Sequence, residues 1–466
     1  MRRGIAAAVI VASLLLGVVL FRGVQREAPG VAPVTPPAQN VVLIIVDTVR
    51  FDRLGCSGNP LGITPRIDRF ALGAVRFEQA YSHAPWTLPS VASLFTSQYP
   101  QQHGAGGRLE DFSMLGEEAV TLAELFRTAG AATAAVTNVL FITETFGTTQ
   151  GFDFVDSEAH GTNLEVRRAG PTTDVALSWL DRRGPEPFFL LVHYFDAHLV
   201  YDPPRSFRER FAAPQDRFIR DHIFGRVAEL MALRKGATTL SPETVDRLEK
   251  LYNGEVAYVD SEVGRLLAGL TERGLDEDTI VVLVADHGEE FLDHGGFEHG
   301  HTLYDELLHV PLIIRAPALG PARAGGTVRP LVRLIDVAPT LCELAGVAPA
   351  DSFEGESLVP LLQGREGADR AVLSQGNMWG AAGDAWRKGR FKLIREQEPE
   401  RIMVFDLLAD PEEANDLAGQ SLELRAELLS DLDLIKRSLG GGAGGGVAPT
   451  LSPEDVERLR SLGYIK

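Results

Sequence analysis

Residues 40–46 read NVVLIIV, a continuous apolar run rich in β-branched side chains. Two later runs have the same texture, FFLLVHYF at 188–195 and TIVVLVA at 279–285. Runs of this kind predict central strands that are covered on both faces. Helical patterns lie between them, including TLAELFRTAG at 121–130 and SEVGRLLAGLTERG at 261–274. Strands that alternate with helices predict an α/β fold with a mostly parallel central sheet and helices on both faces.

The composition limits the class of function. The chain has 466 residues, of which 45% are hydrophobic and 23% are charged, as in an ordinary globular protein. Its net charge of −19 argues against a nucleic-acid partner, because phosphate backbones bind basic surfaces. The two cysteines, Cys56 and Cys342, form neither a disulfide framework nor a zinc-ligand pair by spacing, but one bridge between them stays open.

The first 27 residues have the pattern of an export segment. MRR is followed by the apolar run GIAAAVIVASLLLGVVLF at 4–21, whose basic flank and length suit a membrane anchor or a signal peptide. RGVQR at 22–26 offers no small-x-small cleavage site, so an uncleaved anchor at 1–27 is favoured over a cleaved signal peptide. Both alternatives place the rest of the chain outside the cytoplasm, either at the cell envelope or secreted.

Changes in composition divide the remaining chain. APGVAPVTPPAQ at 28–39 is a Pro/Ala-rich linker, and the α/β pattern then runs from 40 to 369. Residues 370–439 have the texture of a smaller α+β subdomain, and 440–466 combine a Gly-rich linker with the short amphipathic tail LSPEDVERLRSLGYIK. The charge-rich segment 205–250 is expected to be a solvated insertion rather than a lid.

Polar residues follow all three predicted strands. The first strand runs into Asp47, and the third ends in Asp286 and His287. The second carries His193, Asp196 and His198 near its end. Ligands of open α/β sheets bind at the carboxyl ends of the strands. A single Asp or His at such a place is most often a turn or helix cap. Acids and imidazoles on three strands together predict a metal or catalytic site.

The stretch SHAPWTLPSVASLF at 82–95 places Thr87 just before a predicted helix. Pro89 suits the first turn of a helix, where its missing N–H costs nothing. The free N–H groups and the dipole at this end favour an anion, such as an alkoxide or a bound phosphate or sulfate group. A threonine here is either a plain cap or a nucleophile, and a nucleophile needs a metal or a base to activate it.

The residues discussed above lie in three long motifs, which follow one another along the chain. They are residues 40–70 from NVVLIIVD onward, AYSHAPWTLPSVASLFTSQYPQQHG at 80–104, and VVLVADHGEEFLDHGGFEHGHTLYDELLHVPLIIRAP at 281–317. With these motifs the chain resembles the sulfatase family of the alkaline-phosphatase superfamily, over nearly all of residues 40–417. The resemblance implies an alkaline-phosphatase-like α/β catalytic domain at 40–369 with a smaller C-terminal α+β subdomain. It also implies a metal-dependent ester hydrolase.

The chain departs from the sulfatase pattern at the nucleophile. Thr87 stands where the family has a Cys or Ser that is oxidised to formylglycine, and Val91 replaces the Arg of Cys-x-Pro-x-Arg. Because threonine cannot be converted to formylglycine, no formylglycine is expected. Gln98 and Asn138 replace an Arg and a Lys that are common in the family, and Thr48 replaces the second acid of an Asp-Asp pair.

Related superfamily members that transfer phosphoethanolamine or phosphoglycerol use an unmodified threonine and bind one metal ion. The matching residues of this chain are Asp47, Thr87, Asp286 and His287. The resemblance therefore implies one divalent metal ion on these four residues. The imidazole ligand favours zinc or manganese over calcium, which stays an alternative. A metal would lower the pKa of the Thr87 hydroxyl and polarise the ester.

Three further histidines are candidate catalytic residues. His198 matches the substrate-binding histidine of the family. His299 or His301, in EHGHTLYDE, falls near a substrate-contacting lysine of the family, with an ambiguity that leaves both open. Each is expected to protonate the leaving group or to contact a non-bridging oxygen.

The leading hypothesis is an exported, membrane-anchored hydrolase or transferase that acts on phosphate mono- or diesters, or on sulfate esters, through Thr87. One alternative is a sulfuric ester hydrolase that works without formylglycine, and another is a non-catalytic protein that binds an anion or glycan. The expected partner is a small anionic ester, a glycan or a lipid headgroup. The retention of Asp47, Asp286 and His287 together favours the enzyme.

Overall fold

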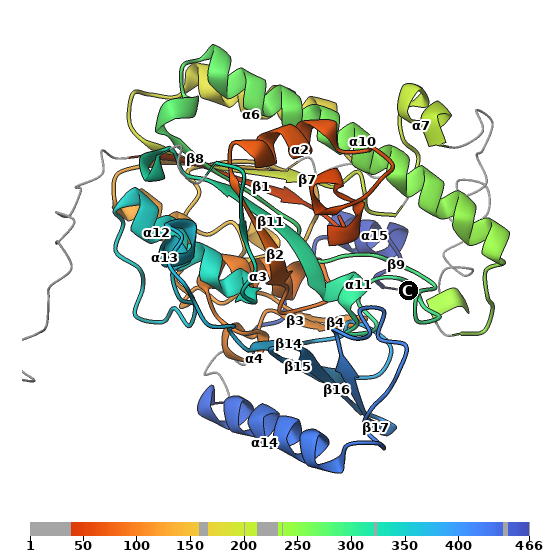
Figure 1. Cartoon of the computed structure of the whole chain (residues 1–466). Coiled ribbons are helices and arrows are strands. Elements are labelled where there is room, and N and C mark those ends of the chain that lie inside the picture. Colours follow the sequence, from red (N-terminus) through yellow and green to blue (C-terminus); the bar gives the residue numbers. More distant parts are fainter. Residues whose placement is uncertain are drawn as a thin grey trace, which may run out of the picture. The chain divides into compact units, whose positions relative to one another are not determined.

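The computed structural model places the three predicted strands side by side at the centre of one sheet (Figure 1). It describes the following parts of the chain: residues 39–157, 166–199, 201–211, 232–234, 236–320, 324–440 and 446–465. These parts fall within one unit that spans Pro37–Lys466. None of their helices is long and apolar enough to cross a membrane. The anchor predicted at 1–27 lies outside the described residues.

The central sheet has nine strands among the described residues. Along the sheet they are β12 Gly326–Val328, β2 Val75–Tyr81, β11 His309–Arg315, β8 Thr279–Val284, β1 Asn40–Val46, β7 Phe188–Tyr194, β5 Ala132–Thr137 and β6 Phe154–Ser157, with β13 Val332–Arg333 paired to β2. Strand β11 pairs antiparallel with β2 and β8, and the remaining described pairs are parallel. The predicted mostly parallel sheet is confirmed.

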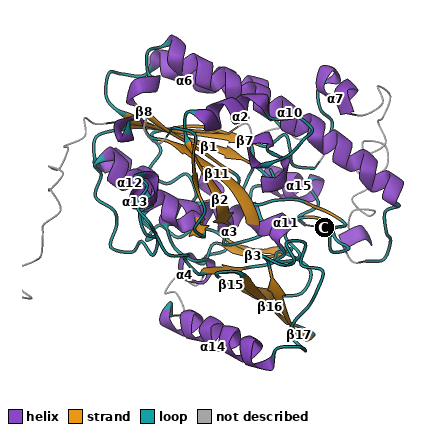
Figure 2. Cartoon of the chain, viewed as in Figure 1, coloured by secondary structure: helices purple, strands orange, loops and turns teal. Residues whose placement is uncertain are grey.

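Helices cover both faces of this sheet (Figures 1 and 2). One layer contains α2 Pro65–Leu72, α6 Ala169–Arg182 and α10 Pro242–Glu272, and the other contains α3 Thr87–Thr96, α5 Leu122–Thr128 and α12 Val337–Ala345. Because helices cover both faces of the sheet, the central strands are apolar throughout: all seven residues of β1 are buried.

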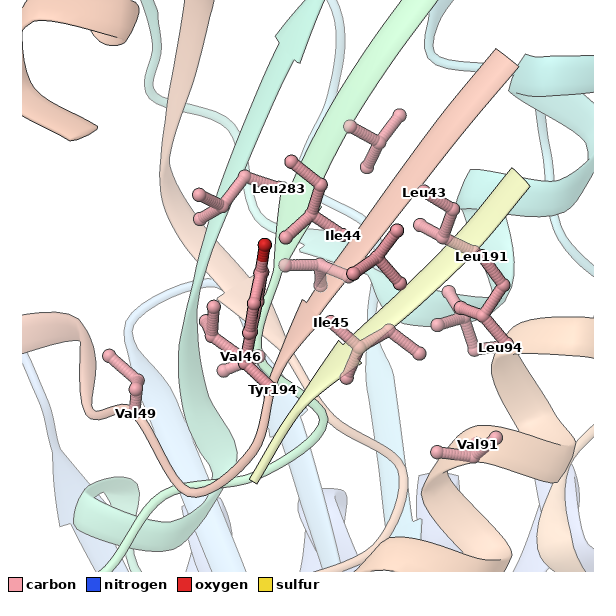
Figure 3. Close-up of a cluster of buried hydrophobic side chains, with 14 of the residues drawn as sticks. Leu43, Ile44, Ile45, Val46, Val49, Val91, Leu94, Leu191, Tyr194 and Leu283 are labelled. Atoms are coloured by element: carbon pink, nitrogen blue, oxygen red, sulfur yellow. The ribbon is translucent and has the colours of Figure 1, made fainter. Parts of the chain in front are cut away.

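The core fills the space between the sheet and its helices (Figure 3). Leu43 and Ile44 of β1 are fully buried, as are Val91 and Leu94 of α3. Full burial of one such side chain contributes about 1.5–3 kcal/mol to folding. The strand ends are therefore attached to the best-packed part of the protein, which holds the side chains that follow them in place.

The C-terminal subdomain is a second, antiparallel sheet with one helix. Its strands are β14 Val372–Gln375, β15 Gly383–Lys388, β16 Phe391–Gln397 and β17 Glu400–Asp406, and the helix is α14 Leu422–Ser438. Helix α14 packs on β15 and β16. This confirms the predicted smaller α+β subdomain, whereas the domain boundaries stay predictions.

The remaining described α-helices and β-strands are short. They are α4 Pro100–His103, α7 Arg205–Phe211, α11 Asp305–Leu308, α13 Val359–Leu362, α15 Pro453–Ser461, the pair β3 Gly106–Arg108 and β4 Asp111–Ser113, and the pair β9 Glu290–Phe291 and β10 Phe297–Glu298.

Two expectations need correction. Part of the segment expected to be a solvated insertion belongs to the core, because α10 begins at Pro242 and buries Leu248 fully. The disulfide that the sequence left undecided does not form, since Cys56 and Cys342 are both free thiols.

Candidate active site

The carboxyl ends of β1 and β8 bring three predicted metal ligands together. Asp47 directly follows β1, and Asp286 and His287 follow β8, which pairs parallel with β1. One ligand atom of each residue lies within 4.8 Å of the others, and all three side chains are buried. The parallel register therefore produces the cluster that the strand ends predicted.

His193 holds Asp47 from the neighbouring strand β7. Ile45 is paired with His193, so Asp47, two residues further, faces the same side of the sheet. His193 Nε2 donates to Asp47 Oδ2 over 3.0 Å. Burial alone would raise the pKa of Asp47, but this hydrogen bond and the nearby His287 and His193 rings lower it. Asp47 is therefore a carboxylate with one oxygen engaged.

Asp286 has the opposite environment. Burial and the negative charge of Asp47 raise the pKa of Asp286 to about 6. Asp47 Oδ1 and Asp286 Oδ2 are both buried and have no hydrogen-bond partner among the described residues. Two unpartnered carboxylate oxygens in a buried site are costly unless a cation sits between them.

The His287 ring completes the donor set. Its Nδ1 lies 3.0 Å from the Gly288 carbonyl, which can only accept, so Nδ1 carries the proton. Nε2 is then a free lone pair, 3.4 Å from Asp286 Oδ2 and 3.6 Å from Asp47 Oδ1. Two carboxylate oxygens and one imidazole nitrogen fit a divalent metal ion.

Thr87 faces the same cluster from helix α3. Its Oγ1 donates to His287 Nε2 over 3.3 Å, and the side chain is 1% exposed. The helix begins at Thr87 with Trp86 as its N-cap, so the prediction that Thr87 precedes the helix was wrong by one residue. The hydroxyl therefore does not cap the helix, and its partner is His287 of the candidate metal cluster.

His299 lies against the cluster, whereas His301 is held elsewhere. The His299 ring is 4.5 Å from the His287 ring and 4.8 Å from the His198 ring. His301 Nε2 pairs with Glu290 at 2.7 Å, and its ring stacks on Trp379. Of the two alternatives left open by the sequence, His299 has the position that suits chemistry.

His299 and Glu289 form a buried pair. His299 Nδ1 is 3.0 Å from Glu289 Oε1. Burial and the neighbouring His287 ring lower the pKa of His299, and burial and Glu298 raise the pKa of Glu289. Both shifts favour the neutral form of the pair, in which Glu289 donates its proton to Nδ1 and Nε2 keeps an N–H.

The positions that depart from the sulfatase pattern have structural roles. Val91 is fully buried in the core, and the Asn138 amide donates to the backbone carbonyl of His193 and to Thr172 Oγ1. The Gln98 amide lies 3.4 Å from the Ser352 carbonyl, and the Thr48 hydroxyl donates to the Asp47 carbonyl over 2.7 Å.

Three residues at the site were not singled out in the sequence. Glu289 follows the DHG motif directly, which is a usable signal. Tyr464 donates to His198 Nε2 over 3.0 Å, and Arg234 bonds the Gly463 carbonyl beside it. Nothing in the local pattern of either residue points to the site, because both reach it through long-range packing.

A model of the sulfatase family matches residues 39–347, and a model of the C-terminal region of N-sulphoglucosamine sulphohydrolase matches residues 293–437. The chain belongs to the sulfatase family. The first match spans more than half of the chain and includes Asp47, Thr87, Asp286 and His287.

Several curated relatives of this sulfatase-family protein are similar over most of their length. It is 26% identical to an arylsulfatase of Clostridium perfringens, over 81% of this chain and 90% of that protein. It is 27% identical to the iduronate 2-sulfatase of Homo sapiens, over 72% of this chain and 70% of that protein. The protein is therefore a hydrolase of the sulfatase superfamily.

Solved structures show the same fold. The phosphonate monoester hydrolase of Agrobacterium radiobacter superposes with a TM-score of 0.71 at 21% identity, covering 89% of this chain and 100% of that one. A protein solved with its substrate D-glucosamine-2-N,6-O-disulfate superposes with a TM-score of 0.72 at 21% identity, covering 86% and 98%. The alkaline-phosphatase-like fold predicted for this chain is confirmed.

Proposed function

We propose that this sulfatase-family hydrolase cleaves a phosphate ester through Thr87 as nucleophile. One observation carries the proposal: the Thr87 hydroxyl lies 3.3 Å from His287 Nε2, beside the unpartnered oxygens of Asp47 and Asp286. The hydroxyl and the metal-ligating groups thus share one buried centre. A binding protein has no need for a hydroxyl at that point.

Asp47, Asp286, His287 and Thr87 would hold one divalent metal ion, with zinc or manganese favoured by the imidazole ligand. A bound ion of this kind lowers the pKa of a coordinated hydroxyl and polarises the phosphoryl oxygen. Helix α3 adds to this effect, because its N-terminal N–H groups and dipole stabilise negative charge at its first residue, Thr87.

The reaction divides into two steps. The Thr87 hydroxyl releases its proton to solvent, and its oxygen attacks phosphorus while the bond between phosphorus and the ester oxygen breaks. His299 Nε2 gives its proton to the departing oxygen while Glu289 gives its own proton to Nδ1, so neither group of the pair needs a charge beforehand. Water, or an alcohol in a transferase, then cleaves the phosphothreonyl ester and returns the protons. His198 contacts a non-bridging oxygen.

The choice of phosphate over sulfate rests on the nucleophile. Sulfatases that use formylglycine need a Cys or Ser at position 87, and this chain has Thr87. The phosphonate monoester hydrolase with the same fold indicates that this scaffold also carries phosphorus chemistry. The curated relatives are named as sulfatases, so a sulfate ester is the competing substrate class.

The test uses the full-length chain, stripped of metal and reloaded with zinc, manganese or calcium. Turnover of an aryl phosphate monoester, an aryl phosphodiester and an aryl sulfate is compared for the wild type, Thr87→Ala and Thr96→Ala. Thr96 is a matched control, because it is a buried threonine on the same helix whose hydroxyl donates to the Ala92 carbonyl. Acid quenching and mass spectrometry then look for phosphate on Thr87.

Metal-dependent turnover of a phosphate ester that survives in Thr96→Ala and is lost in Thr87→Ala supports the proposal. Turnover of the sulfate alone would contradict the substrate class. Phosphatase activity that persists in Thr87→Ala would contradict the nucleophile. Metal binding with no turnover of any of the three classes would favour a protein that only binds an anion or glycan.

We also propose that residues 1–27 export the chain and anchor it, with residues 40–369 outside the cytoplasm. The support is the basic flank and the apolar run at 4–21. Fusing residues 1–39 to a reporter that is active only outside the cytoplasm tests this. An inactive reporter would contradict export, and an active reporter released from membranes in soluble form would indicate cleavage.

A further inference from the structure

The C-terminal segment Val447–Ile465 reaches the candidate active site, where Tyr464 contacts His198. The Val447 carbonyl accepts from the Met114 N–H over 2.9 Å, and helix α15 follows with Leu459 fully buried. Tyr464, which follows this helix in the chain, is 1% exposed. The centroid of its ring lies 4.9 Å from that of the Phe141 ring, in an edge-to-face arrangement. The last side chains of the described chain are thus part of the core.

The Tyr464 hydroxyl occupies the free nitrogen of His198. His198 Nδ1 lies 2.6 Å from the Leu199 carbonyl, so it carries the proton and Nε2 is an acceptor. Tyr464 donates to this Nε2 over 3.0 Å. Burial and the negative charge of Asp47 raise the pKa of Tyr464, so the phenol keeps its proton. Both nitrogens of His198 are therefore satisfied from within the chain.

Arg234 fixes this closed arrangement. Its guanidinium bonds the Gly463 carbonyl and lies over the Tyr464 ring, 6.0 Å from the centroid. It is also paired with Glu298 at 2.7 Å, with side chains that are 4% and 2% exposed. Removing either partner of a charge pair this deeply buried is costly, because it leaves the other charge buried and uncompensated. Tyr464 is thus held by a defined set of contacts.

In this closed form the reacting groups are out of reach. His198 is 4% exposed, Thr87 is 1% exposed and His299 is 2% exposed. An ester that contacts His198 needs the Nε2 position that the phenol fills. Substrate binding and the Tyr464 contact are therefore mutually exclusive.

We infer that Tyr464 determines substrate affinity by competing with the ester for His198, and that the C-terminal segment must release it before an ester binds. This inference rests on the proposed role of His198 as a substrate contact. A binding-competent form that is only partly populated raises the apparent dissociation constant in proportion. Weakening the Tyr464 contact therefore lowers KM, whereas kcat stays unchanged.

The first test compares Tyr464→Phe with Tyr258→Phe in the full-length, zinc-loaded chain. Tyr258 is the matched control, because its hydroxyl accepts from the Gly170 N–H over 2.8 Å on helix α10, away from the site. One buried hydrogen bond contributes about 1 kcal/mol, so KM should fall roughly 5-fold in Tyr464→Phe, and Tyr258→Phe should match the wild type. A fall in kcat in Tyr464→Phe, or a rise in KM, would make Tyr464 part of the catalytic machinery and overturn the inference.

The second test needs no turnover and uses inorganic phosphate as the probe. Phosphate should bind Tyr464→Phe more tightly than the wild type by a similar factor in calorimetry. By reciprocity, phosphate should speed tryptic cleavage after Arg460, which lies in α15 with a side chain that is 45% exposed. Equal phosphate affinity, no phosphate binding by either chain, or protection of Arg460 would each overturn the inference. If no ester turns over, the proposed function fails, and these readings still decide the role of Tyr464.

Discussion

At the scale of single residues, Asp47 and Asp286 belong to one cluster but differ in their surroundings. The hydrogen bond from His193 keeps Asp47 ionised, whereas Asp286 has a pKa of about 6 because of burial and the charge of Asp47. A raised carboxylate pKa means that folding favours the protonated form, so stability falls as pH rises from 3.8 through about 6. At neutral pH and without metal, the charge on Asp286 therefore opposes folding.

Replacing Asp286 with asparagine should have opposite effects on the two forms of the protein. Without metal, Asp286→Asn should raise the free energy of unfolding by about 1–3 kcal/mol at neutral pH, because the repulsion from Asp47 is removed. With zinc or manganese, the variant should lose the stabilisation that the wild type gains from binding. Thermal unfolding with and without added metal measures both.

The control for this prediction is Asp351→Asn, since Asp351 is an exposed acid away from the site. It should unfold like the wild type in both conditions. A metal-free Asp286→Asn that is less stable than the wild type would show that the carboxylate is needed for packing and not for binding a cation.

The strand ends predicted that Asp47, Asp286 and His287 lie together at one edge of the sheet, whereas Thr87 was added to them only by the resemblance to superfamily members with a threonine nucleophile. His299 could not be separated from His301, since their difference is the partner each ring finds in space. Tyr464 lies 266 positions from His198, and no local pattern encodes that contact.

At the scale of elements, the loop from β8 to β11 carries His299 and is held by ion pairs. Asp293 pairs with Arg50 at 2.9 Å, and His294 Nδ1 lies 2.8 Å from Glu306 Oε1. Burial opposes the charged form of His294, but the hydrogen bond and the charge of Glu306 raise its pKa to about 8. The loop is thus partly stabilised by a proton.

This pair should make stability depend on pH in a narrow window. A histidine whose pKa is raised by folding contributes stability that is complete below 6.5 and is lost as pH rises through about 8. The contribution should be about 1 kcal/mol, allowing for solvent screening at this partly exposed ring. The difference in free energy of unfolding between the wild type and His294→Gln, measured by denaturant titration, should shrink by this amount across the window.

His103→Gln is the control, because burial lowers the pKa of His103 to about 3 and the ring stays neutral throughout the window. Its destabilisation should be constant from pH 6.5 to 8. A difference for His294→Gln that is equally constant would mean that the Glu306 contact does not retain the proton.

Among the elements, the central strands were the most predictable, because a continuous apolar run has few alternatives to a buried strand. Helix α10 was predicted only in its second half. Its first turns carry many charges and were assigned to an insertion, although Leu248 and Tyr252 on the inner face are fully buried. Packing against the rest of the core overrides the charged texture there.

At the scale of the whole molecule, a buried lysine joins the C-terminal subdomain to the catalytic part. Lys392 of β16 is 1% exposed, and its Nζ lies 2.7 Å from Asp305 and 2.9 Å from Glu413. Asp305 begins α11 in the catalytic part, so the ion pair with Lys392 links the two parts. The composition of the two parts predicted that a subdomain exists, but not which contacts dock it.

Removing this lysine should loosen the subdomain far more than removing an exposed one. Lys392→Met removes the counter-charge of Glu413 and the nearer of the two cations beside Asp305, the other being Arg387 at 3.7 Å, which should cost about 3–5 kcal/mol. Lys388→Met removes pairs to Glu427 and Asp431 from a side chain that is 49% exposed, and should cost at most about 1 kcal/mol. Denaturant titration gives both values, and tryptic cleavage within the subdomain should accelerate only in Lys392→Met. Equal losses in the two variants would contradict a docking role for Lys392, because an ion pair that matters no more when buried than when exposed cannot hold the two parts together.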